Sequence, residues 1–136
     1  MRRLLASALL LPALAGVAIA AEPDEKWEMT TYQVAFLKRG PNWTPTETPE
    51  TKAIQEGHMA NIRRMGATGK LVIAGPFADD GDLRGLFIFR VDTLEEAKAL
   101  AEQDPAVKAG RLVLEWHPWF AAKNIVVTPR AAAPKP

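Results

Sequence analysis

Two histidines and a few acidic side chains are the groups in this chain that could carry out chemistry. The sequence contains His58 and His117, and it contains no cysteine. A histidine side chain ordinarily titrates near neutral pH, which suits it to accept and donate protons. The absence of cysteine excludes disulfides, cysteine nucleophiles and thiolate metal sites. We therefore expect any reaction to depend on histidine and carboxylate groups.

His58 lies in a segment whose apolar residues recur at helical spacing. It follows Ile54 by four residues and precedes Ile62 by four, so it falls on the stripe that faces the core. A histidine on an apolar face is more often a hydrogen-bonded core residue than a proton-transfer group. Spacing alone leaves both interpretations open: His58 is either a satisfied core side chain or part of an active site.

The acidic candidates are Asp104 and the pair Asp79-Asp80. The pair precedes Gly81, a pattern typical of a turn, and a structural role in that turn is the preferred interpretation. Asp104 precedes Pro105 at the end of a predicted helix, where a negative charge meets the unfavourable end of the helix dipole. We expect a histidine or a bound substrate to compensate for that charge.

Metal and cofactor sites are not predicted. His117 lies 59 residues from His58, no H-E-x-x-H motif is present, and neither glycine-containing segment fits a phosphate-binding loop. An anionic substrate could bind Arg84 or Arg111, and the sequence does not select between them. Four aromatic side chains either line a pocket or pack in the core and interfaces: Trp43, Trp116, Trp119 and Phe120.

The first twenty of the 136 residues differ from the rest and have the pattern of a secretory signal peptide. Arg2 and Arg3 precede an apolar run that ends in Ala18-Ile19-Ala20. We predict cleavage after Ala20, giving a periplasmic or secreted bacterial protein with no membrane segment. Cleavage removes two arginines and no acidic residue, so the formal net charge changes from +1 to −1. A charge this near zero argues against nucleic-acid binding.

The mature chain predicts a single domain of α+β class. After a charged lead-in at 21–28, strands are expected at 29–37, 70–76, 83–91 and 111–116, and helices at 49–68 and from 94 to about 103. A short turn or 3₁₀ piece is expected at 106–110. This β-α-β-β-α-β order is the ferredoxin-like arrangement with a four-stranded antiparallel sheet. An Ala/Pro-rich tail covers 121–136, and residues 125–127 could form an exchanged strand.

The first strand predicts how the sheet is covered. Tyr32, Val34 and Phe36 alternate with more polar neighbours, so we expect this strand to bury one face. In a ferredoxin-like fold the helices cover only one side of the sheet, and the other side would expose an apolar patch that soluble monomers avoid. We therefore expect a homodimer in which two sheets pack face to face.

An ordered set of short motifs resembles the YCII-related (YciI-like) family of dimeric α/β-barrel proteins. None is specific alone, but their order covers residues 29–120. The motifs are a helix-borne His58, Ala74-Gly75-Pro76-Phe77, an acidic turn from Asp79 to Gly85, a helix beginning Leu94 to Ala97, Asp104-Pro105 followed by Gly110, and Pro118-Trp119.

The resemblance implies a domain at 29–120 that dimerises through its sheets and carries a histidine–aspartate site. Carried over by position, His58 and Asp104 would be the catalytic pair. The residues implied or proposed to bind the ligand are Gly75, Pro76, Phe77 and Arg84. The family is similar in fold to muconolactone isomerases, and one relative is a dehydrochlorinase acting on a chlorinated hydroxyhydroquinone.

Two functions are compatible with this reading. The first is a cofactor-independent lyase or isomerase that uses His58 and Asp104 on a small molecule, aromatic or lactone in type. The second is a non-catalytic periplasmic protein that binds a small molecule or a partner and keeps the dimeric fold, with His58 satisfied in the core. Three features distinguish this chain from the usual family pattern: the signal peptide, a Pro-rich loop from Gly40 to Pro49, and the additional C-terminal segment.

Overall fold

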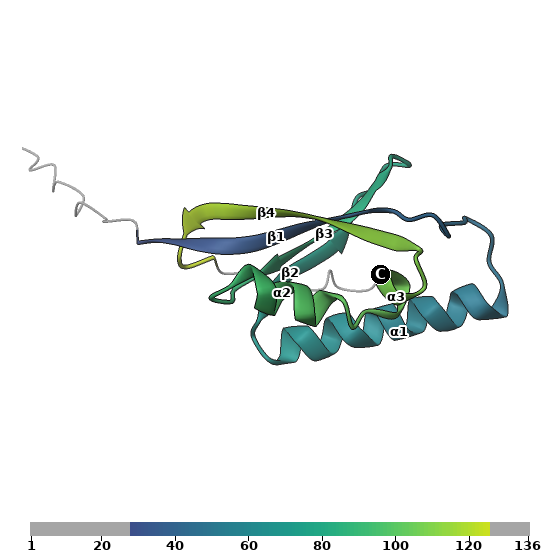
Figure 1. The fold of residues 1–136 in the computed structure, drawn as a ribbon, viewed down its shortest axis with the longest axis horizontal. Helices are drawn as coiled ribbons and strands as arrows, with labels where there is room; N and C mark the ends of the chain where they lie inside the picture. Colours follow the sequence, from purple (N-terminus) through teal and green to yellow (C-terminus); the bar gives the residue numbers. More distant parts are fainter. Residues whose placement is uncertain (1–27, 126–136) are drawn as a thin grey trace, which may run out of the picture.

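The computed structural model describes residues 28–125, which form a four-stranded sheet with helices on one face (Figure 1). The strands are β1 (Met29–Arg39), β2 (Leu71–Pro76), β3 (Leu83–Phe89) and β4 (Leu112–Ala122). The helices are α1 (Pro49–Ala67), α2 (Leu94–Ala101) and α3 (Pro105–Lys108). The predicted signal peptide at 1–20, most of the lead-in, and residues 126–136 lie outside the described residues.

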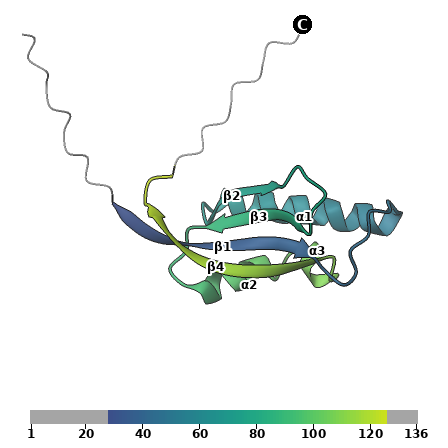
Figure 2. The ribbon, with the colours of Figure 1, turned by 90° about the horizontal axis from the view of Figure 1, so that it is seen from above.

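The sheet has the strand order β2-β3-β1-β4, and all neighbouring strands are antiparallel. Figure 2 shows β1 and β3 in the middle of the sheet with β2 and β4 at its edges. Strand β4 pairs with β1 along its whole length, from Met29 opposite Ala122 to Arg39 opposite Leu112. This is the ferredoxin-like arrangement, and the predicted α+β fold is confirmed.

The start of α1 is fixed by a reciprocal pair of threonines. The Thr51 amide donates to Thr48 Oγ1 at 3.1 Å, and the Thr48 amide donates to Thr51 Oγ1 at 2.8 Å. Pro49 occupies the first helical position, where its fixed φ suits the helix and its missing N–H is not needed. Because the helix begins at a defined residue, the direction in which each later side chain points is also defined.

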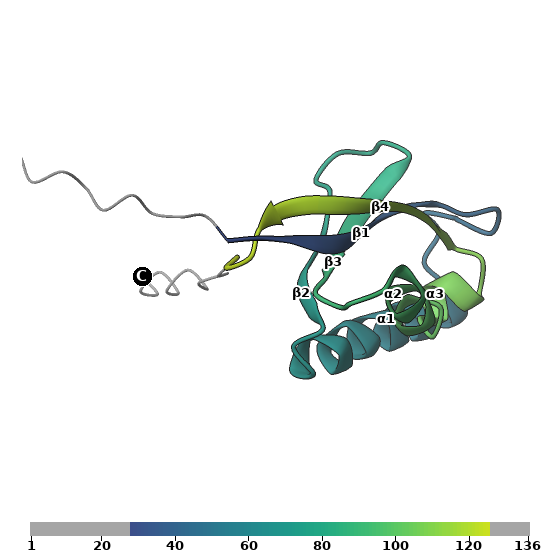
Figure 3. The same cartoon turned by 60° about the vertical axis from the view of Figure 1, so that its left-hand side comes forward.

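Strand β1 buries side chains on both faces, so the prediction of one buried face is wrong. Ala35 and Leu37 pack against the helices, whereas Tyr32 and Val34 belong to a second apolar cluster on the opposite face. The reason is the central position of β1, where side chains from both flanking strands shield it. Figure 3 shows the helices gathered below the sheet. The second cluster, called here the open-face cluster, consists of Tyr32, Val34, Ile88 and Ala121, with Phe36, Val72, Ile73, Leu86 and Ile125 packed against it.

Strand β4 continues beyond the expected end at residue 116 and beyond the expected domain boundary at 120. It includes Pro118, which lies opposite Gln33. The Lys123 amide donates to Glu28 O, and the Gly40 amide donates to Arg111 O, so the alternation of the ladder turns the Pro118 nitrogen away from β1. An edge strand tolerates proline in that orientation because no ladder hydrogen bond is lost.

The region after α2 also differs from expectation. Helix α2 ends at Ala101, and α3 begins as a separate short helix at Pro105. Ile125 packs against the open-face cluster of its own chain, whereas the remainder of the proposed exchanged strand lies outside the described residues. Within residues 28–125, no helix is long and apolar enough to cross a membrane.

Candidate active site

His58 on α1 and Asp104 at the N-terminus of α3 form a buried hydrogen-bonded pair. His58 Nδ1 lies 2.9 Å from Asp104 Oδ1 and 2.8 Å from Asp104 Oδ2. The carboxylate is fully shielded from solvent, and His58 is 9% exposed. The contact expected between the two residues is therefore present, but its expected reason, a carboxylate at the unfavourable end of a helix dipole, is wrong because Asp104 lies at the N-terminal end of α3.

Asp104 is held by two further donors. Asn61 Nδ2 donates to Oδ2 at 3.1 Å, and the Ala106 amide donates to Oδ1 at 2.8 Å. Burial by itself would raise the pKa of Asp104. The hydrogen bond and charge of His58, together with the donors on Ala106 and Asn61, outweigh burial and lower that pKa below its ordinary value. Asp104 is therefore ionised at neutral pH.

The helix context of Asp104 differs from the sequence expectation. Asp104 is the N-cap of α3 and accepts the Ala106 amide, instead of terminating the preceding helix. A carboxylate at an N-cap satisfies a backbone N–H that would otherwise lack a partner. The same side chain thus starts a helix and binds the histidine.

In the uncharged form of the His58 ring, the ionised carboxylate determines which nitrogen carries the proton. Because Asp104 can only accept, Nδ1–H donates and Nε2 keeps its lone pair. Nε2 has no hydrogen-bond partner among residues 28–125, and the His58 ring lines a pocket. Phe87 stacks on the ring with centroids 6.0 Å apart and planes at 23°. This arrangement presents a fixed proton acceptor.

Gly57 allows α1 to approach α3 closely enough for this contact. A Cβ atom at Gly57 would lie 2.9 Å from Cγ of Pro105. The proline ring immediately follows Asp104 and cannot rotate away as a flexible side chain would. A side chain at position 57 would therefore separate the two helices that carry the pair.

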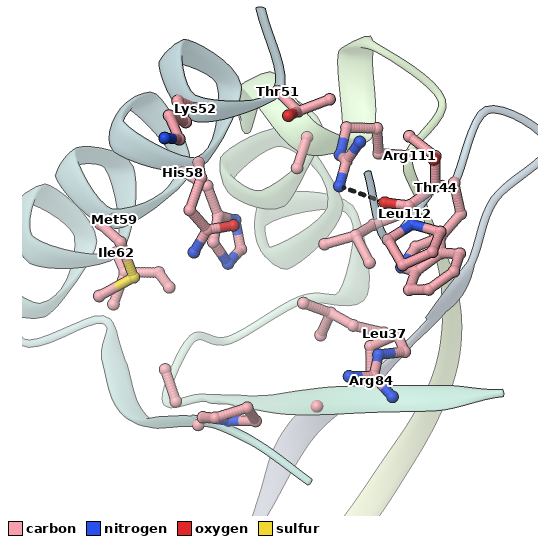
Figure 4. A pocket seen from close by; sticks show the side chains of 18 of the residues that line it. Leu37, Thr44, Thr51, Lys52, His58, Met59, Ile62, Arg84, Arg111 and Leu112 are labelled. Atoms are coloured by element: carbon pink, nitrogen blue, oxygen red, sulfur yellow. Dashed lines mark hydrogen bonds between the residues drawn. The ribbon is translucent and has the colours of Figure 1, made fainter. Parts of the chain in front are cut away.

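The pocket has a volume of about 540 Å³ and lies between the sheet, α1 and the loop at 40–48 (Figure 4). Gly75, Pro76 and Arg84, all predicted as binding residues, line it together with His58. Phe77 is not among the lining residues; its amide donates to Arg84 O at the end of the β2–β3 pairing. The other predicted acid, Asp79, accepts the Gly81 amide at 3.2 Å, which is the turn role preferred for it.

The four aromatic candidates separate into different environments. Only Trp43 lines the pocket, and its ring lies 4.2 Å from Cζ of Arg39. Trp116 packs against the helix-side core. Trp119 and Phe120 are 43% and 67% exposed near the end of β4.

His117 belongs to the other side of the sheet. Its Nε2 lies 2.9 Å from Glu115 Oε1, and its ring packs edge-on against Phe36 of the open-face cluster. In the part of the chain that the structure describes, no three histidine or acidic side chains gather in a way that could hold a metal ion.

The sequence profile of the YCII-related domain matches residues 34–117, which is more than half of the chain. The chain belongs to the YCII-related family. Among solved structures, this YCII-related chain is similar to 5-chloro-2-hydroxyhydroquinone dehydrochlorinase from Burkholderia phenoliruptrix AC1100, in complex with 2,5-dihydroxybenzoquinone. That similarity has 19% identity and a TM-score of 0.48, and it covers 66% of this chain and 93% of the other. No curated protein sequence gives a significant match.

Three residues of this YCII-related protein that position the pair are not predicted from the sequence: Gly57, Asn61 and Phe87. Asn61 follows His58 by three residues, so both lie on one helix face, and that spacing could have identified it. Gly57 and Phe87 act through packing across elements. No local pattern in the sequence signals contacts of that kind.

Proposed function

We propose that this YCII-related protein is a cofactor-independent enzyme of the lyase or isomerase type, in which His58 transfers a proton on a small molecule bound in the pocket. The observation that carries the proposal is the buried hydrogen bond from His58 Nδ1 to Asp104, which leaves Nε2 as the acceptor on a ring that lines the pocket. Membership of the YCII-related family is compatible with this function.

The chemistry follows from the orientation of the ring. His58 Nε2 would remove a proton from a carbon or hydroxyl of the substrate, and Asp104 would remain ionised and stabilise the imidazolium that forms. In an isomerisation His58 returns the proton to a different atom of the same molecule. In an elimination the substrate instead loses a leaving group with its bonding electrons, and the proton passes to solvent.

Asp104 acts in this scheme as a positioning residue, because it acts through His58. The Asp104 carboxylate is held by a hydrogen bond from Asn61 Nδ2. The Asn61 side chain is held in turn, because its Oδ1 accepts from Arg64 Nη2 at 2.6 Å. Two layers of hydrogen bonds therefore hold the imidazole in one orientation. Such support is what general-base catalysis by a single histidine requires.

The test uses α-angelica lactone, whose ring CH₂ lies between a carbonyl and a double bond. Removal of a proton there and its return at the far end of the double bond gives the conjugated isomer, which is followed by ultraviolet absorbance and by NMR in D₂O. We expect the wild type to accelerate this reaction, His58→Ala to abolish the acceleration, and added imidazole to restore part of it. His117→Ala is the matched control because that histidine lies on the other sheet face.

Equal rates for wild type and a folded His58→Ala variant would contradict catalysis by His58. Circular dichroism establishes that the variant is folded, and His58→Gln provides a second variant if it is not. A loss of stability in both variants without any change in rate would instead favour the non-catalytic binding protein, with His58 as a core residue.

We also propose that two copies associate through their sheet faces. The support is the open-face cluster, which no helix of residues 28–125 covers and whose outer members Phe36 and Leu86 are only half-buried. Trp119 and Val113 are 43% and 41% exposed. A second copy placed on this face would bury apolar side chains that otherwise contact water.

Export of the mature protein remains our proposal from the sequence of residues 1–20. The support is the pattern of two arginines, an apolar run and small residues at 18 and 20. Mass spectrometry of the protein recovered from a bacterial host tests it. A mature N-terminus at Ala21 in the periplasmic fraction is expected, and an intact Met1 terminus in the cytoplasm would contradict it.

A further inference from the structure

The charges around the pocket are unbalanced. Three cationic side chains line it, and one of them, Lys52, pairs with the lining carboxylate of Glu47 at 3.3 Å. Arg84 and Arg111 also line the pocket, and neither lies within 4.0 Å of a carboxylate among residues 28–125. Two guanidinium groups therefore face one cavity without a counter-charge in the described part of the chain.

Both guanidinium groups are held in place by neutral acceptors. Arg111 Nη2 donates to the Thr44 carbonyl at 3.1 Å. Arg84 Nη1 donates to the carbonyls of Asp79 and Gly81 at 3.1 and 3.2 Å. Backbone carbonyls orient a guanidinium but leave its positive charge uncompensated, so each group keeps its attraction for an anion.

Arg111 differs from Arg84 in having a buried nitrogen without a hydrogen-bond partner among residues 28–125. That nitrogen is Nη1, which is shielded from solvent. A ligand in the pocket does not reach that shielded atom directly, but a partly buried positive charge is unfavourable, and a negative charge beside the guanidinium would reduce that cost. In Figure 4, Arg111 and His58 project from different elements toward the same space.

The rest of the lining describes the other part of the ligand. Leu37, Ile62, Phe87 and Leu112 provide apolar surface in the same pocket as the two arginines and the histidine. A volume of about 540 Å³ is in the usual range for pockets that take small organic molecules. The lining therefore matches a molecule with an apolar body and one anionic group.

We propose that the substrate is a small organic anion with an apolar ring, whose carboxylate or equivalent planar oxyanion binds Arg111, with Arg84 as a second cation. Its ring lies against the apolar wall within reach of His58. The inference rests on the proposed function in placing the reacting atom at His58, but the anion site itself is defined by the arginines.

The probes are benzoate and benzamide, which share one planar shape and differ by one charge, and binding is measured by isothermal titration calorimetry. We expect the wild type to bind benzoate at least about tenfold more tightly than benzamide, as a charge-assisted pair allows. Arg111→Met should remove this preference, and Arg111→Lys should retain part of it because it keeps the charge and loses the planar fork. Arg90→Met removes an exposed arginine outside the pocket and should leave the preference unchanged.

The proposal would be overturned if benzamide bound as tightly as benzoate, if the preference survived in Arg111→Met, or if it followed Arg84→Met alone. Failure here is distinguishable from failure of the proposed function because the lactone probe carries no charge. Lactone isomerisation that depends on His58 without a benzoate preference would reject only the anion site. A benzoate preference that depends on Arg111, with no effect of His58 on the lactone, would reject only the catalytic role.

Discussion

Asp104 Oδ2 accepts a hydrogen bond from His58 Nδ1 at 2.8 Å. The two residues are 46 positions apart in the sequence, and the Asp104 carboxylate is fully buried. This hydrogen bond joins the N-cap of α3 to a residue in the middle of α1. The same contact orients the imidazole and ties α3 to α1. Changes to this contact should therefore affect both the stability of the fold and the orientation of the imidazole.

Loss of either partner should destabilise the fold. His58→Ala leaves a buried carboxylate without its strongest donor, and we expect the free energy of unfolding to fall by about 3 kcal/mol. Asp104→Ala should cost a similar amount because it also removes the N-cap of α3. The double variant should lose less than the two single losses combined, measured by urea unfolding. Additive losses would mean that the pair is not energetically coupled.

Stability should depend on acid pH through Asp104. The pKa of Asp104 is lower in the folded protein than in the unfolded chain, so the folded state binds fewer protons between the two values. The stability from this group is therefore complete above the ordinary aspartate pKa of about 3.9 and is lost as pH falls through the lower folded value. Urea unfolding measured from about pH 5 to about pH 2 should show a smaller decline in the free energy of unfolding for Asp104→Asn than for the wild type.

Gly57→Ala should separate the two helices that carry the His58–Asp104 pair. The new methyl group would meet the Pro105 ring, so we expect a loss of about 1–3 kcal/mol, as overpacking usually causes. Lactone isomerisation should fall as well because α1 moves away from Asp104. Gly66→Ala is the matched control, since a Cβ there meets nothing within 4 Å and alanine favours the helix. Equal effects of the two substitutions would rule out a special role for Gly57.

A charge on the open face should prevent association. Phe36 packs on the open-face cluster, and Phe36→Glu would place a carboxylate where the second copy is proposed to sit. Light scattering after size-exclusion chromatography should show a dimer for the wild type and a monomer for this variant. Met59→Glu alters an exposed apolar residue of α1 and should remain dimeric. A monomeric wild type would reject the proposed interface.

The sequence predicted the element order and the strands because their patterns are local. Alternating apolar residues, the proline after Thr48 and the Asp104-Pro105 break each act within a few positions. These signals also placed His58 on the inner face of its helix. The family resemblance pairs that histidine with Asp104.

What the sequence could not predict depends on neighbours far along the chain. Whether β1 buries one face or two is decided by the strands that flank it, and Gln33 is buried despite its polarity. The position of β4 at an edge decides that Pro118 can remain in a strand. The clearance at Gly57 is a contact with another helix. None of these relationships can be predicted from the pattern of a few consecutive residues.

Pro118 has one more consequence, for how molecules of this protein meet at high concentration. Its nitrogen points toward the free edge of β4. Alternate residues of β4 direct their backbone N–H and C=O groups toward that edge, where they could pair with a strand of another molecule. The proline leaves a gap in that row just past the middle of the strand. Strand addition at this edge would lose a hydrogen bond at that point, which disfavours the edge-to-edge growth that leads to fibrils. The long exposed edge of β4 therefore carries one local feature that opposes this kind of aggregation.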